Sequence, residues 1–183
     1  MPHRDLKYLQ GYPPETLAQV GKLMAEDRVG TWLQAKYPKA HEVRTDKALF
    51  TYVQTLRSEH LRGADPLSKV LFDNKLHVVN NALGTHTTVS RVQGIKLKAK
   101  REIRVASLFK TVPDEFLRMI TVHELAHMKE RAHDKAFYQL CTYMEPRYHQ
   151  LEFEVRVYLT HLDTNQRPLW LSTPDETKTP PPL

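Results

Sequence analysis

The pattern His123-Glu124-Leu125-Ala126-His127 combines two imidazoles and a carboxylate at a spacing that suits metal chemistry. Successive residues of an α-helix turn about 100° around its axis, so His123 and His127 would lie one turn apart on the same side. The two rings can hold one Zn²⁺ ion, and Glu124 can accept a proton from water bound to that ion. We therefore predict a metal site that activates water, with Glu124 as the general base.

A third histidine, His133, follows the motif after six residues. On a continuous helix it would lie about 15 Å along the axis from His123, too far to share an ion. His133 can join the pair only if the helix ends between Met128 and Ala132 and the chain folds back. Asp134 is a good N-cap for a following helix, which would leave His133 in the connection. The predicted ligands of a single Zn²⁺, or of another divalent metal, are His123, His127 and His133.

An alternative third ligand remains open at this stage. In another arrangement of this motif the pair is completed by a glutamate farther along the chain. His133 already stands at the separation used by three-histidine sites, although those sites have a glycine midway and this chain has Glu130 and Arg131 there. The candidate glutamates are Glu145, Glu152 and Glu154.

Three histidines would leave one coordination position open for water, which is typical of a catalytic rather than a structural zinc site. The ion lowers the pKa of that water, and Glu124 takes the proton as the water attacks. The chemistry indicated is hydrolysis, with either a peptide carbonyl or a phosphorus atom as the electrophile.

A run of basic residues in the middle of the chain gives a second signal. Strand alternation would place Lys96, Lys98 and Lys100 on one face. Several such cations would favour a substrate that carries phosphate, and we take Arg91, Lys96 and Lys98 as candidate substrate contacts. The alternative interpretation is an exposed edge strand that its lysines protect from aggregation.

Length and composition limit the class of protein. A chain of 183 residues fits one domain, and we expect residues 1–171 to form it and residues 172–183 to be a disordered tail. The single cysteine, Cys141, allows no intramolecular disulfide, and no apolar stretch is long enough to span a bilayer. We expect a cytoplasmic protein without membrane association. The net charge of +6 lacks the clustering of a dedicated nucleic-acid-binding arm, so we expect no dedicated nucleic-acid binding.

The secondary structure expected around the motif is helical at both ends and β-rich in the middle. Apolar spacing predicts a helix through residues 17–33, with a possible interruption at Gly30, and a second helix capped by Thr45. A small twisted sheet of three to five strands is expected within residues 69–108, with a hairpin turn at residues 73–75 joining its first two strands. A capping box at residues 111–114 is expected to start the helix that carries the motif. Two further helices are predicted over residues 135–144 and 148–161.

The stretch VHELAHMKERAHDKAFYQL, from Val122 to Leu140, resembles the signature of the YgjP-like zincins. Similar agreement extends over residues 5 to 165, through YLQGYP, DNKLHVVNNALGTHTTVSRVQG and EPRYHQLEF. The resemblance implies an α+β, metallopeptidase-like (zincin-like) single domain: N-terminal helices, a small twisted sheet, the HExxH helix and C-terminal helices. It implies zinc ligands and a catalytic glutamate at the positions given above.

The resemblance also implies a substrate. It points to a UTP pyrophosphatase that releases UMP and diphosphate, whereas the spacing of the motif itself selects no base. The alternative is a cytoplasmic zinc metallopeptidase that uses the same four residues on a peptide carbonyl. A third interpretation is a nucleic-acid-associated module with a metal-stabilised core, for which strongly salt-dependent DNA binding would be the sign.

Overall fold

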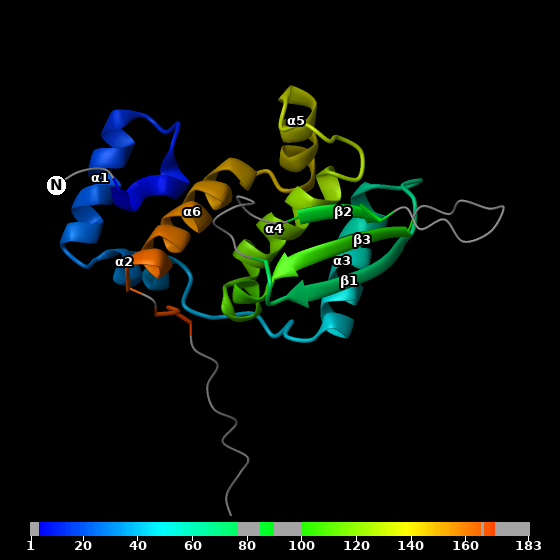
Figure 1. Cartoon of the computed structure of the whole chain (residues 1–183), viewed down its shortest axis with the longest axis horizontal. Coiled ribbons are helices and arrows are strands. Elements are labelled where there is room, and N and C mark those ends of the chain that lie inside the picture. Colours follow the sequence, from blue (N-terminus) through cyan, green and yellow to red (C-terminus); the bar gives the residue numbers. More distant parts are fainter. Residues whose placement is uncertain (1–3, 77–84, 90–99, 166, 171–183) are drawn as a thin grey trace, which may run out of the picture.

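The computed structural model describes residues 4–76, 85–89, 100–165 and 167–170. A small sheet lies at one end of the molecule with α3 and α4 beside it, whereas α1, α2 and α6 gather at the other end (Figure 1). The elements are η1 (Arg4–Leu9), α1 (Pro14–Ala25), α2 (Val29–Lys36), α3 (Asp46–His60), β1 (Leu67–Asp73), β2 (Thr85–Val89), β3 (Lys100–Ala106), η2 (Ser107–Thr111), α4 (Asp114–Ala126), α5 (Lys135–Met144) and α6 (Tyr148–Asn165). The fold is α+β, as predicted.

The sheet has the strand order β1-β3-β2, with β3 in the centre. β1 runs parallel to β3, pairing Val70 with Ile103, and β2 runs antiparallel to β3, pairing Thr87 with Glu102. Ile103 and Val105 are fully buried, as their alternation predicted. The described residues contain three strands, which agrees with the predicted number of three to five.

The expected hairpin between the first two strands is only partly tested. A turn does form after β1, where the Asp73 carboxylate accepts a hydrogen bond from the backbone N–H of Lys75 at 2.8 Å. However, the neighbour of β1 is β3, which lies more than twenty residues farther along the chain. Residues 77–79 of the predicted second strand, the basic run at 91–99 and the predicted tail at 172–183 all lie outside the described residues.

The N-terminal helical segment is broken earlier than predicted. The chain forms α1 and α2, and between them Asp27 adopts a φ of +50°, in the left-handed region that ends a helix. Gly30 lies within α2 rather than at the break, and a Cβ at this position would approach Leu169 Cδ2 to 2.9 Å. The cap of α3 is as predicted, because Thr45 accepts a hydrogen bond from Ala48 N–H.

α4 is the central helix, and every residue from Met119 to Ala126 is buried. The predicted capping box at its start is wrong, because Pro113 is the N-cap and makes no side-chain cap bond. α5 has the predicted bounds, while α6 continues to Asn165, four residues beyond the predicted end. None of the helices in the described ranges is long and apolar enough to cross a membrane.

Candidate metal centre

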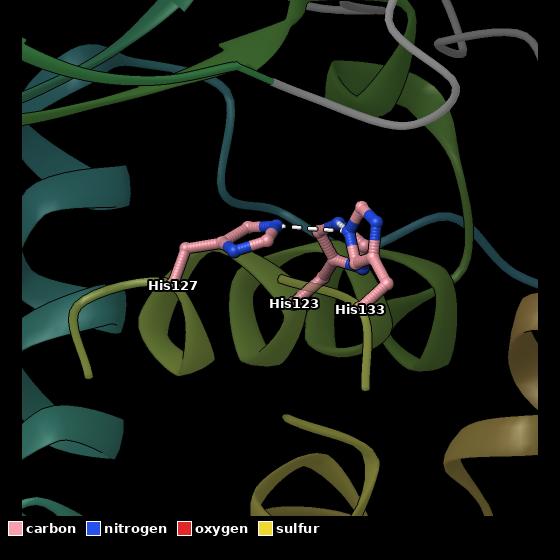
Figure 2. A group of neighbouring side chains, drawn as sticks. All are labelled: His123, His127 and His133. Carbon is pink, nitrogen blue, oxygen red and sulfur yellow. Dashed lines mark hydrogen bonds between the residues drawn. The ribbon is translucent and has the colours of Figure 1, made fainter. Parts of the chain in front are cut away.

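The rings of the three predicted ligands point towards one another (Figure 2). His133 Nε2 lies 3.0 Å from His127 Nε2 and 3.2 Å from His123 Nε2. A tetrahedral zinc ion with bonds of about 2.0–2.1 Å separates its ligand nitrogens by about 3.3–3.4 Å. The observed separations are therefore close to those of a metal-bound set. Among the described residues, this is the one group of three or more ligand-bearing side chains close enough to share an ion.

The chain folds back after the helix, as the third ligand required. α4 ends at Ala126, two residues before the predicted range, and the next turn is tightened by a 3.1 Å bond from Met128 N–H to the Leu125 carbonyl. Asp134 caps α5, since its carboxylate accepts a hydrogen bond of 3.1 Å from Phe137 N–H. His133 thus lies in the connection immediately before this cap, on the exposed side of the site.

Phe137 supports the site in a way that sequence reasoning missed. Its buried ring contacts all three imidazoles, with centroid distances of 5.0 Å to His123, 4.6 Å to His127 and 4.7 Å to His133. Because Phe137 stands in the first turn of α5, the cap that starts this helix also places the ring beneath the histidines.

The hydrogen bond of His127 fixes which of its nitrogens is available to a metal. Its Nδ1 lies 2.9 Å from the backbone carbonyl of Glu130, and a carbonyl can only accept. A neutral His127 therefore carries its proton on Nδ1 and presents a lone pair at Nε2. Burial lowers the pKa of both His123 and His127, which favours the neutral form that binds a metal.

Glu124 is a fully buried carboxylate on the same helix. Neither of its oxygens has a hydrogen-bond partner within the described part of the chain, and burial raises its pKa to about 8. Leaving such a group without a partner is costly unless a cation or water completes its surroundings. Three convergent imidazole nitrogens are the donor set that a divalent metal with a bound water requires, and Glu124 adds an unpartnered carboxylate on the same helix as His123, so the residues present fit such an ion.

The alternative third ligands have other partners. Each of the three downstream glutamates is buried and forms an ion pair with a basic side chain, and none belongs to the histidine group. Their negative charges are therefore compensated by these basic side chains, which are half-buried or exposed. The pairs are Glu145 with Arg118 at 2.7 Å, Glu152 with Arg156 at 2.8 Å, and Glu154 with Lys36, to which the Tyr37 hydroxyl also donates.

Arg101 is a second residue whose role sequence reasoning missed. Its guanidinium, on β3, donates a 2.8 Å hydrogen bond to the carbonyl of Met128, in the turn that follows α4. It also forms an ion pair with Asp65 at 2.9 Å. Arg101 thus ties the sheet to the turn that leads to His133. The predicted substrate contacts Arg91, Lys96 and Lys98 lie outside the described residues.

The fold and the site together define a metallopeptidase-like protein, in which one histidine on α4, a second at its C-cap and a third from the following loop converge, and a buried glutamate follows the first of them. The family model described as "YgjP-like, metallopeptidase domain" matches residues 84–156. The UTP pyrophosphatase of Escherichia coli (strain K12) is 59% identical over 162 residues, which cover 88% of this chain and 97% of that protein. The chain belongs to the YgjP-like family. No solved structure matches it.

Proposed function

We propose that the protein is a zinc-dependent hydrolase that cleaves UTP to UMP and diphosphate. The observation that carries the hydrolase is the convergence of three imidazole nitrogens, together with the unpartnered carboxylate of Glu124, the residue that follows His123 on α4. The substrate is taken from the relative that shares 59% of its sequence with this chain and is named for that activity. The combination predicts one metal ion per chain and a small nucleotide substrate.

In this proposal His123, His127 and His133 hold the ion through Nε2. Three neutral imidazoles with one open position suit Zn²⁺, although other divalent metals accept the same donors. A Zn²⁺ ion held there would supply Lewis acidity to water and to an oxygen of the scissile phosphoryl group.

Glu124 is the proposed general base. One of its carboxylate oxygens would take the proton of the water that attacks the α-phosphorus, as the bond from that phosphorus to the bridging oxygen breaks and diphosphate leaves. Neither of its oxygens has a hydrogen-bond partner among the described residues, so the carboxylate is available to that water. Positive charge from Arg91, Lys96 and Lys98 would stabilise the leaving diphosphate.

A second candidate is a zinc metallopeptidase that uses the same four residues on a peptide carbonyl. The description of the matching family model as a metallopeptidase domain favours it. The two candidates differ in the electrophile and share the metal, the water and the base. In both cases we propose a cytoplasmic enzyme, because its single cysteine is a free thiol.

The test compares substrates with one zinc-loaded preparation. The protein is incubated with UTP, with the other nucleoside triphosphates and with unfolded casein, and Glu124→Gln serves as the matched control, since it keeps the shape of the side chain and loses the base. We expect UMP and diphosphate from UTP, and a turnover lower by a factor of about 10²–10⁴ in the variant. Cleavage of casein with no turnover of UTP would refute the pyrophosphatase and support the peptidase.

An isotope experiment locates the bond that breaks. In water enriched in ¹⁸O, attack at the α-phosphorus puts the label into UMP, whereas attack at the β-phosphorus puts it into diphosphate. Mass spectrometry of the two products tells them apart. Label found in diphosphate would contradict the proposed attack at the α-phosphorus while leaving the metal site in place.

A further inference from the structure

The hydroxyl of Tyr148 lies 2.7 Å from His123 Nδ1, on the side of the ring opposite the metal-facing nitrogen. Tyr148 is the first residue of α6 and is fully buried. His123 can offer a lone pair at Nε2 only if its proton is on Nδ1. The proton in the bond between Tyr148 and His123 therefore decides whether this ring can bind a metal.

The partner of His123 differs in kind from the partner of His127. A backbone carbonyl only accepts, so Glu130 alone fixes the tautomer of His127. A tyrosine hydroxyl can donate or accept, so Tyr148 favours the ligand form of His123 only when its own proton goes elsewhere.

The acceptor available for that proton is Cys141, on α5. Its thiol is close enough to the Tyr148 hydroxyl for the two groups to interact, it is fully buried, and it forms no disulfide. Sulfur is a weak acceptor, yet in this enclosed position a bond to it spares the hydroxyl an unmade hydrogen bond. If Tyr148 donates to Cys141, its oxygen is left to accept from His123 Nδ1.

We propose that Cys141 and Tyr148 act as a positioning pair that keeps His123 in the tautomer that binds the metal. The order of donation runs from His123 Nδ1–H to the Tyr148 oxygen, and from the Tyr148 O–H to Cys141 Sγ. Second partners of this kind raise the basicity of a ligating imidazole and hold its orientation, and losing one typically costs 10–100-fold in metal affinity. The proposal rests on the proposed metal-binding function of the three histidines.

Packing alone would make a different prediction. The ring of Tyr148 lies nearly parallel to that of His123, at 18° with 6.4 Å between centroids, and it packs beside Tyr138. Tyr148→Phe keeps this ring and removes only the oxygen. A purely structural tyrosine would therefore lose some stability in the variant and leave the affinity for zinc unchanged.

The experiment measures zinc affinity by competition with a chromogenic chelator, and the thermal stability of the zinc-free protein alongside. Tyr158→Phe is the matched control, because Tyr158 is also buried on α6 but packs against Phe116 and Trp170, away from the histidines. We expect Tyr148→Phe to bind zinc 10–100-fold more weakly. We expect Tyr158→Phe to bind it like the parent. Equal affinities for Tyr148→Phe and the parent would overturn the proposal, as would equal losses in the two variants.

Two changes at Cys141 test the second half of the pair. Cys141→Ser retains an acceptor and should retain the affinity for zinc, whereas Cys141→Val has a similar volume without an acceptor and should weaken binding. A valine variant that binds zinc as tightly as the serine variant would remove Cys141 from the proposal. Long-range ¹H–¹⁵N spectra of the zinc-free protein give a readout without metal: His123 should carry its proton on Nδ1 in the parent and divide between the two tautomers in Tyr148→Phe.

These measurements use no substrate, so they separate the pair from the reaction. A parent protein that binds zinc, shows the expected loss in Tyr148→Phe and fails to hydrolyse UTP would refute the proposed activity and support the pair. A parent that hydrolyses UTP while Tyr148→Phe keeps full zinc affinity would support the proposed activity and refute the pair. A parent that binds no metal at these histidines would overturn both.

Discussion

Asp134 is the N-cap of α5 and directly follows His133, so we expect this cap to affect both the stability of the helix and the binding of the metal. Its carboxylate accepts the Phe137 N–H at 3.1 Å and so starts the helix that carries the ring beneath the histidines. Replacing an N-cap aspartate by alanine costs about 1 kcal/mol. In a protein of this size, a loss of 1 kcal/mol lowers the melting temperature by about 2–4 °C. We expect Asp134→Ala to show this decrease in the zinc-free protein.

The same change should weaken metal binding. If the first turn of α5 must be re-formed for His133 to reach the ion, the binding of zinc loses up to the same free energy of about 1 kcal/mol, which corresponds to a roughly fivefold higher dissociation constant. Chelator competition measures this constant, and a thermal scan of the zinc-free protein measures the stability. Asp134→Asn should keep the zinc affinity and the melting temperature of the parent, because asparagine caps a helix about as well as aspartate.

Thr45→Ala provides the control, since Thr45 caps α3 through Ala48 N–H at 3.2 Å and the histidines are on other elements. It should lower the melting temperature by a similar amount and leave zinc affinity unchanged. The reasoning fails if Asp134→Ala loses stability and keeps the parent affinity, because the cap would then hold the helix without placing His133. It fails equally if Thr45→Ala weakens zinc binding to the same extent.

Three further outcomes are expected. Glu124→Gln should keep its zinc, by metal analysis, and lose a factor of about 10²–10⁴ in turnover of UTP, and a variant as fast as the parent would remove the general base from the proposal. His127→Ala should lose the metal, so that added zinc no longer raises its melting temperature, and a rise like that of the parent would show that the ion binds elsewhere. Burial raises the pKa of Cys141 to about 12, so only about one thiol in 10⁴ is ionised at pH 8. Iodoacetamide should label it quickly only in denaturant, and rapid labelling of the native protein would show that the thiol is accessible.

Helices and their caps were predictable where the signal is local. Thr45 and Asp134 each precede an amphipathic stretch, and both cap as expected. Thr111 failed as a cap because η2 continues to this residue and Pro113 is the N-cap of α4 instead. The pairing of β1 with β3 was not predictable from alternation, since strand pairing depends on contacts across the intervening chain and the pattern of one strand does not name its neighbour. The break between α1 and α2 was not predicted at Asp27, because it depends on the backbone angle of this one residue and not on a pattern of apolar positions.

In the metal centre too, the local features were predictable from the sequence and the contacts between elements were not. Its three histidines fall within eleven residues of sequence, so helix geometry and one cap were enough to predict that they converge. Two side chains that contact His123 or the turn before His133 come from other elements: Tyr148 from α6 and Arg101 from β3. A tyrosine at the start of an apolar helix gives no sign in the sequence that its hydroxyl faces an imidazole. Only the packing of α6 against α4 brings the two together.

The position of β1 limits how far the molecule can be shortened. The segment matched by the family model, residues 84–156, begins after β1 and ends inside α6. A fragment made of this segment alone would lack β1, so one edge of β3 would be unpaired. It would also lack the apolar residues of α3 that pack on the sheet. It would also cut the contacts between the two ends of the chain, such as the ion pair of Lys7 with Asp163 and the bond from Arg156 to the Tyr8 carbonyl. We infer that the described residues fold as one unit, and that a fragment limited to residues 84–156 would expose its core and lose the histidine geometry.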